Sequence, residues 1–130
     1  MRIVICGSMS SIDDMINVKK ELLQKNHHVT LPKTIDGETD HESTKNKIEH
    51  DLIRGYFKEI GSADAVLIVN VEKKGIPNYI GGNSFLEMAF AHVLNKKIFL
   101  LNSVPDMIYT DEIEAMQPVV LSSDFSKIEN

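Results

Sequence analysis

Short apolar runs alternate along this chain with longer segments in which apolar residues recur every three or four positions. The first run, Ile-Val-Ile-Cys at 3–6, is apolar on both faces, which is typical of a strand inside a parallel sheet. Strands that alternate with helices predict an α/β fold whose parallel sheet is covered by helices on both faces. The predicted strands are 3–6, 28–31, 65–69, 98–101 and 119–121, and the predicted helices are 12–25, 41–60, 84–94 and 111–116.

The length of 130 residues is that of one domain, and we expect a single domain over 1–130. Five strands in this length suit a doubly wound, Rossmann-like three-layer sandwich in flavodoxin-like strand order. In such sheets the ligand binds beyond the carboxyl ends of the strands, where the strand order reverses. We therefore expect the segments Gly7-Ser8-Met9, the stretch from Asn70, and Asn102-Ser103 to meet at one site.

The composition excludes several classes of function. A net charge of −5, from 14 Lys and Arg against 19 Asp and Glu, lacks the dense basic face that binds a nucleic acid polymer. No apolar stretch approaches the ~20 residues that span a bilayer, and the run at 3–6 is too short for a secretion signal. We expect a cytoplasmic protein. The single Cys6 excludes an internal disulfide and a multi-cysteine metal site, and the scattered histidines predict no metal site.

The turn after the first strand, Gly7-Ser8-Met9-Ser10-Ser11, is the first candidate site. Small residues let backbone amides approach an anion, and the start of a helix adds partial positive charge. The alternative is a tight turn in which Ser11 caps the helix that follows. The turn lacks the P-loop lysine and the three-glycine dinucleotide fingerprint, so neither ATP nor NAD is supported and no cofactor is expected.

The second candidate is the stretch from Gly81-Gly82 through Asn83-Ser84 to Glu87, which joins paired glycines to the start of a helix. Glycines permit close backbone approach to a ligand. Glu87 stands among apolar neighbours, where a carboxylate can have an altered pKa and act as nucleophile or base. The alternative is a capping box, in which Glu87 only returns a hydrogen bond to Ser84.

Two segments carry no apolar periodicity. The polar stretch 33–47 is expected to be a long loop, of the kind that often forms a lid, and its end turns helical from His41. The tail 122–130 is expected to fray. Cys6 is expected to be buried, because a free cysteine is usually inside.

Four stretches resemble the nucleoside 2-deoxyribosyltransferase family, including its deoxynucleoside monophosphate N-glycosidase branch. They are Ile-Cys-Gly-Ser at 5–8, Ala-Asp-Ala-Val-Leu at 63–67, Asn-Ser-Phe-Leu-Glu-Met-Ala-Phe-Ala at 83–91 and Asn-Lys-Lys-Ile at 95–98. The stretch 83–91 is the most specific, because the family places its glutamate nucleophile on this helix. The order of elements is similar over nearly the whole chain.

The resemblance implies that Glu87 attacks the anomeric carbon of a 2-deoxyribosyl group. A covalent glycosyl-enzyme would form, and water or a second base would resolve it, as in a retaining glycosidase that uses two carboxyl groups. No metal is implied, and the substrate is a deoxynucleoside or its nucleotide. The implied substrate-binding residues are Cys6, Gly7, Ser8, Met9, Tyr56, Gly81, Gly82, Asn83, Ser84 and Asn102.

The chain departs from the family pattern at three positions. Val4 replaces a tyrosine that members often carry, and Gly81 stands where transferases tend to have an acid. Tyr56 stands where many members have an aspartate, eight residues before Asp64. Asp51 is therefore the candidate for the assisting acid. The missing transferase acid favours hydrolysis over base exchange.

Two other functions stay open. A lysine-decarboxylase-like phosphoribohydrolase also pairs two glycines with a glutamate at a helix start, although it carries a further glycine and threonine that Asn83-Ser84-Phe85 does not supply. A nucleotide-binding or sensing module would keep the pocket without turnover. In each case we expect a homodimer or higher homo-oligomer, because a second copy can close a site that one small domain leaves open.

Overall fold

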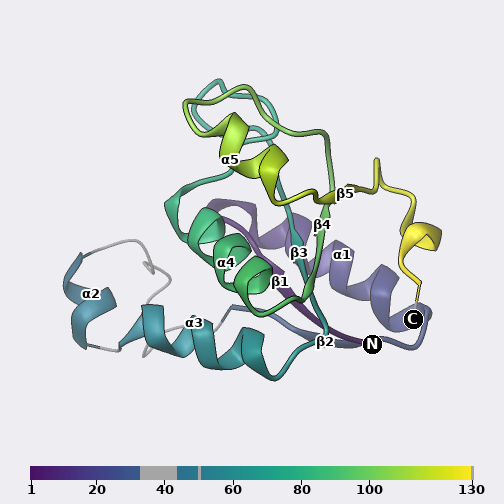
Figure 1. Ribbon diagram of the computed structural model, residues 1–130. Helices are drawn as coiled ribbons and strands as arrows, with labels where there is room; N and C mark the ends of the chain where they lie inside the picture. The colour runs from purple at the N-terminus through teal and green to yellow at the C-terminus, as the bar shows by residue number, and fades with distance from the viewer. Residues whose placement is uncertain (33–43, 50, 130) are drawn as a thin grey trace.

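In the part of the chain that the structure describes, five strands form one parallel sheet. The structure is a computed structural model, and it describes residues 1–32, 44–49 and 51–129. The sheet order is β2-β1-β3-β4-β5, so the order reverses between β1 and β3 (Figure 1). This confirms the predicted doubly wound α/β fold with flavodoxin-like order. The strands are β1 (Arg2–Cys6), β2 (His28–Thr30), β3 (Ala65–Ile68), β4 (Lys97–Leu100) and β5 (Val119–Val120).

Helices cover both faces of the sheet, as Figure 1 shows. Alternate residues of β1 face opposite layers: Ile3 and Ile5 pack in the core on the α1 side, whereas Val4 and Cys6 pack in the core beneath α3 and α4. The sheet is therefore buried on both sides, as its continuous apolar strands predict. The helices are α1 (Ile12–Gln24), α2 (Thr44–Glu49), α3 (Leu52–Gly61), α4 (Gly82–Val93) and α5 (Thr110–Ala115), with short 3-10 turns η1 (Met9–Ser11) and η2 (Phe125–Lys127).

The predicted helix 41–60 is divided into α2 and α3. The division lies at Asp51, whose φ of 47° places it in the left-handed region, where a helix cannot continue. The described end of the stretch 33–47 is helical from Thr44, in agreement with the expectation that a helix begins near His41. Residues 33–43, which include most of the expected lid, lie outside the described residues.

The starts of α1 and α4 differ from both capping hypotheses. Ser11 does precede α1, but its hydroxyl makes no cap and instead donates to the Ser8 carbonyl at 2.7 Å. Helix α4 begins at Gly82, two residues earlier than predicted, and its N-cap residue is Gly81. Ser84 therefore lies inside the first turn, so Ser84 and Glu87 do not form a capping box.

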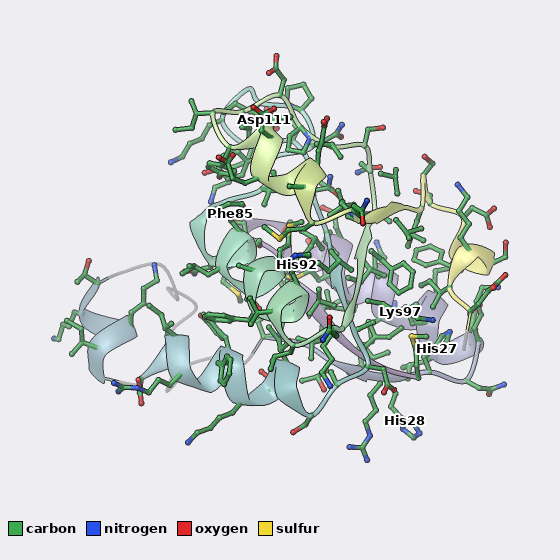
Figure 2. All side chains as sticks on the ribbon, in the orientation of Figure 1. His27, His28, Phe85, His92, Lys97 and Asp111 are labelled. Atoms are coloured by element: carbon green, nitrogen blue, oxygen red, sulfur yellow. The ribbon has the colours of Figure 1, made fainter. Side chains whose placement is uncertain are left out.

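The expectation that the tail frays is wrong. Ile128 is 7% exposed and packs in the core on the α1 side, next to Leu121 and the partly buried Phe125. Lys97 at the start of β4 donates from Nζ to the Glu129 carbonyl at 3.1 Å, and Figure 2 shows Lys97 in this region. Two apolar side chains in a polar segment are enough to hold the chain end on the sheet.

None of the helices in the described ranges combines the length and the apolar character that crossing a membrane requires.

Candidate functional site

Two neighbouring cavities, both lined by described residues, open at the reversal of strand order. The smaller cavity, of about 200 Å³, lies between the turn after β1, the loop after β3 and the start of α4. The larger cavity, of about 500 Å³, is lined by residues of β1, α3 and α4. Gly7 and Asn83 line both cavities, so one ligand can extend from the larger into the smaller. Ligands of doubly wound sheets bind at this place in the fold.

Glu87 on α4 lines the larger cavity and is 8% exposed. Burial raises the pKa of this carboxyl from 4.5 to about 7, and the nearby negative charge of Glu59 raises it further, whereas a hydrogen bond from the Cys6 thiol lowers it. Glu87 therefore titrates in the neutral pH range rather than as an ordinary surface carboxyl group. A carboxylate with so little water around it can act as a nucleophile or a base.

Cys6 lies behind Glu87, not in either cavity lining. The side chain is fully buried at the end of β1, on the face of the sheet that α4 covers. Burial, and to a lesser degree the charge of Glu87, raises the pKa of the thiol well above its usual value. The thiol therefore keeps its proton, and its Sγ donates to the Val4 carbonyl at 3.9 Å. The burial of Cys6 confirms the prediction from the sequence.

Glu59 is the acid that the sequence analysis missed. It lies on α3, lines the larger cavity together with Glu87, and is close enough to influence the pKa of both Glu87 and Cys6. The signal for it was present in the sequence, because residues three apart share one face of a helix and Tyr56 was already a candidate. Both Tyr56 and Glu59 do line this cavity.

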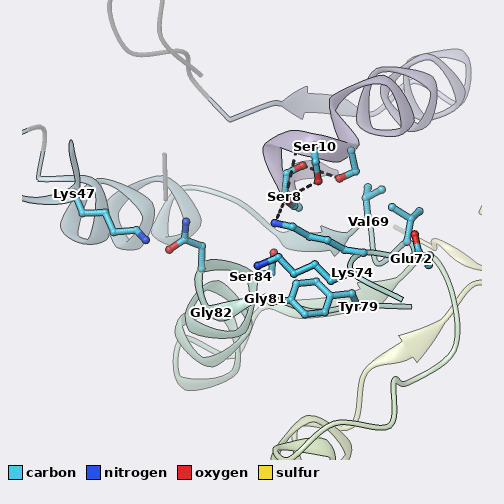
Figure 3. A pocket seen from close by; sticks show the side chains of 15 residues that line it. Ser8, Ser10, Lys47, Val69, Glu72, Lys74, Tyr79, Gly81, Gly82 and Ser84 are labelled. Carbon is cyan, nitrogen blue, oxygen red and sulfur yellow. Dashed lines mark hydrogen bonds between the residues drawn. The ribbon is translucent and has the colours of Figure 1, made fainter. Parts of the chain in front are cut away.

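A tight hairpin brings two lysines to the smaller cavity. Lys73 and Ile76 exchange backbone hydrogen bonds of 3.2 and 3.0 Å across Lys74-Gly75, which both have positive φ, as a type I′ turn requires. Lys73 Nζ donates to Ser8 Oγ at 2.7 Å, and Ser8 Oγ lies 3.0 Å from Ser10 Oγ (dashed lines at Ser8 in Figure 3). Neither lysine was predicted as a site residue, since Lys73 is 65 residues from Ser8.

The start of α4 supplies further groups to the smaller cavity. The N-cap residue Gly81 has no side chain to cap the first amides of the helix. Ser84 is 5% exposed and lines the cavity, and its hydroxyl has no hydrogen-bond partner within the described parts of the chain. Figure 3 shows Ser84, Gly81 and Gly82 on the opposite side of the cavity from Ser8. The lining also contains three lysines, Lys47, Lys73 and Lys74, against one carboxylate, Glu72.

Gly7 is a glycine for reasons of space. A Cβ atom there would lie 3.1 Å from Met15 Sδ and 3.4 Å from both Ser11 Oγ and the Val69 carbonyl. A side chain at this position would require these atoms to shift by a few tenths of an ångström, and its absence leaves room at the wall that the two cavities share.

The structure brings most of the predicted site residues together. Three of them line neither cavity: Cys6, which is described above, Asp51 and Asn102. Asp51 is exposed at the start of α3, where its carboxylate is 3.4 Å from the guanidinium of Arg54. Asn102 forms two hydrogen bonds with the fully buried Asn70. The Asn102 backbone N–H donates to Asn70 Oδ1 at 2.9 Å, and Asn102 Nδ2 donates to the Asn70 carbonyl at 3.0 Å. These bonds connect the ends of β3 and β4. The cavity residues that were predicted are Gly7 and Asn83 in both, Ser8, Gly81, Gly82 and Ser84 in the smaller, and Met9, Tyr56 and Glu87 in the larger.

The arrangement joins a buried carboxyl group to a cavity suited to an anion. No group of three or more His, Cys, Asp or Glu side chains that could hold a metal ion occurs among the described residues, and Figure 2 shows His27 and His28 far from His92 on α4. The described residues that line the two cavities supply carboxyl, hydroxyl and ammonium groups. The chain matches no protein-family model, and no curated protein sequence matches it.

Proposed function

We propose that the protein hydrolyses the N-glycosidic bond of a 2′-deoxynucleoside 5′-monophosphate, with Glu87 as the nucleophile, as in the nucleoside 2-deoxyribosyltransferase-like family. One observation carries the proposal. A buried carboxyl group with a pKa of about 7 lines an open cavity that adjoins a second cavity rich in lysine and hydroxyl groups. A nucleotide has this polarity, since a phosphate stands at one end and a flat, largely apolar base at the other.

The phosphate binds in the smaller cavity. It accepts hydrogen bonds from the first amides of α4 and from the hydroxyls of Ser8 and Ser84, and Lys73 neutralises part of its charge. Asn83 and Gly7 stand at the boundary of the two cavities, which is the place for the deoxyribose. The base occupies the larger cavity, whose walls include Val4, Met9, Pro32, Leu52 and Tyr56.

The reaction passes through a covalent intermediate. The carboxylate of Glu87 attacks C1′ and forms an ester bond with it, while the bond from C1′ to the base nitrogen breaks and the base leaves with a proton. Water then attacks C1′, gives up one proton and releases Glu87 as a carboxylate. The products are the free base and 2-deoxyribose 5-phosphate. The ionised form of Glu87 is the reactive one.

The resemblance supports hydrolysis over base exchange. The family places its nucleophile at the position of Glu87, and the acid that transferases carry six residues earlier is Gly81 here. Gly81 contributes no carboxylate, and the nearest atom to a Cβ at this position would be Tyr79 Cε1 at 3.1 Å.

The test is release of free base from the four deoxynucleoside monophosphates, followed by chromatography, with the four deoxynucleosides and the ribonucleotides as parallel substrates. We expect release from at least one deoxynucleoside monophosphate and its loss in Glu87→Gln. Glu21→Gln, at an exposed site on α1, is the matched control and should keep full activity.

Three outcomes contradict the proposal. Equal rates for Glu87→Gln and the unaltered protein would exclude Glu87 as the nucleophile. Faster cleavage of ribonucleotides would favour a phosphoribohydrolase instead. Tight binding of a nucleotide by calorimetry, without any release of base, would identify a binding module.

A further inference from the structure

Hydrolysis of an N-glycosidic bond needs a second ionisable group besides the nucleophile. The departing base needs a proton, and the water that resolves the intermediate must lose one. Glu87 cannot do either while it is bonded to C1′. Among the described residues that line the larger cavity, the titratable groups besides Glu87 are Tyr56, Lys58 and Glu59, and Glu59 is the one carboxylic acid of the three.

The helix that carries Glu59 is packed against the core and against α4. Ile60, the next residue on α3, is fully buried in the core beneath that helix. Phe57 meets Phe90 of α4 edge to face, with ring centroids 5.4 Å apart and an angle of 88° between the rings. These contacts fix α3 against α4, the helix that carries Glu87, and Glu59 is itself only partly exposed.

Resting on the proposed hydrolysis, we propose that Glu59 is its general acid and base. In the first step the protonated carboxyl of Glu59 donates its proton to the base nitrogen as the bond to C1′ breaks and Glu87 bonds to C1′. In the second step the Glu59 carboxylate takes a proton from water, whose oxygen attacks C1′ and displaces the carboxylate of Glu87. Glu59 is then protonated again, and water is the one reactant consumed besides the nucleotide.

The two carboxyl groups are electrostatically coupled, because both line one cavity and the negative charge of Glu59 is one of the causes that raise the pKa of Glu87. Two such groups lose their protons in separate steps, and between these steps the pair shares one proton. The proposed reaction uses the arrangement in which Glu59 holds that proton and Glu87 is the carboxylate.

The position of this acid is particular to this chain. The family pattern puts an aspartate at the position of Tyr56, and Glu59 lies three residues later on the same side of α3. Asp51, the other upstream acid, is exposed and paired with Arg54. One turn of helix therefore separates the acid used here from the position at which the resemblance places it.

The test compares the nucleotide that the protein hydrolyses fastest with the same nucleotide carrying an activated base, which is N7-methylated for a purine or 5-halogenated for a pyrimidine. An activated base leaves with little or no help from a proton. We expect Glu59→Gln to slow the natural substrate roughly 100-fold or more and the activated substrate far less. Glu87→Gln should slow both alike, and Glu21→Gln should slow neither.

A second measurement on Glu59→Gln distinguishes loss of the general acid and base from a folding defect of the variant. With the activated substrate, the first step should be fast and the second slow, so we expect a burst of one base per protein molecule and a glycosyl adduct on Glu87 in the intact mass. The assignment of Glu59 would be overturned if Glu59→Gln slowed both substrates equally and gave no burst. It would also be overturned if Tyr56→Phe or Asp51→Asn, instead of Glu59→Gln, slowed the natural substrate much more than the activated one. No release by the unaltered protein from any substrate would overturn the proposed function itself.

Discussion

The two cavities of the site differ in the polarity and charge of the side chains that line them. The larger cavity has mostly apolar walls and two carboxylic acids, Glu59 and Glu87, and burial there raises the pKa of Glu87. The smaller cavity has lysines, serines and the start of a helix, and attracts negative charge. In the proposed reaction, phosphate binding and bond cleavage therefore depend on different residues, so we expect them to respond separately to substitution.

Glu87→Gln gives the largest expected effect. Without a nucleophile, kcat for the deoxynucleoside monophosphate should fall by roughly 1000-fold or more. Binding of the same nucleotide, measured by calorimetry, should change little because the smaller cavity is intact. Loss of binding together with activity would show that the two cavities do not act separately.

The same substitution should stabilise the folded protein at alkaline pH. The pKa of Glu87 is raised in the folded state, so the protonated form is favoured there, and stability is lost as pH rises from the unfolded value of 4.5 through about 7. At pH 8 this loss is about 3 kcal/mol, and Gln does not suffer it. We expect denaturant unfolding to show a more stable Glu87→Gln at pH 8 and no difference at pH 4. Lower stability at pH 8 would contradict the burial of a charge at this position.

Lys73→Ala tests the smaller cavity alone. Removing a charged hydrogen-bond donor costs about 1.5–3 kcal/mol, which raises KM for a deoxynucleoside monophosphate roughly 10- to 100-fold. KM for the matching deoxynucleoside, which has no phosphate, should not change. Lys20→Ala on the exposed side of α1 is the control. An equal rise in KM for both substrates would place Lys73 elsewhere than at the phosphate.

Cys6→Ala should give the smallest effect. The thiol hydrogen bond lowers the pKa of Glu87, so its removal raises that pKa further and moves the acidic limb of the kcat/KM profile to higher pH. At pH 6 the activity should drop a few-fold, while at pH 9 it should stay unchanged. Cys6→Ser, which keeps a donor, should move the limb less. A shift toward lower pH would contradict the direction of this hydrogen bond.

The layered sheet could be predicted from the sequence because each strand is a short run such as Ile-Val-Ile-Cys, which is apolar on both faces. The same logic located the Gly7-Ser8 turn and the start of α4, since parallel strands end at one edge. Glu87 was found for a related reason, as a carboxylate inside an otherwise apolar helix face.

The other site residues depend on tertiary structure that periodicity does not contain. Whether Asp51 or Glu59 faces the cavity depends on where α3 begins. The left-handed backbone of Asp51, which precedes α3, cannot be recognised from the pattern of apolar residues. Lys73 reaches Ser8 through a hairpin and across 65 positions of sequence. Ile128 looks like one apolar residue in a polar tail, and its packing in the core with Leu121 depends on contacts that the sequence pattern does not show.

The sheet ends on both sides in its shortest strands. β2 has three residues and β5 has two, so each edge offers very few unpaired backbone groups to another strand. A strand from a neighbouring molecule would gain few hydrogen bonds there, which lowers the tendency to aggregate edge to edge. The helices offer a different surface for self-association, since Phe57 of α3 and Val93 of α4 are exposed apolar side chains.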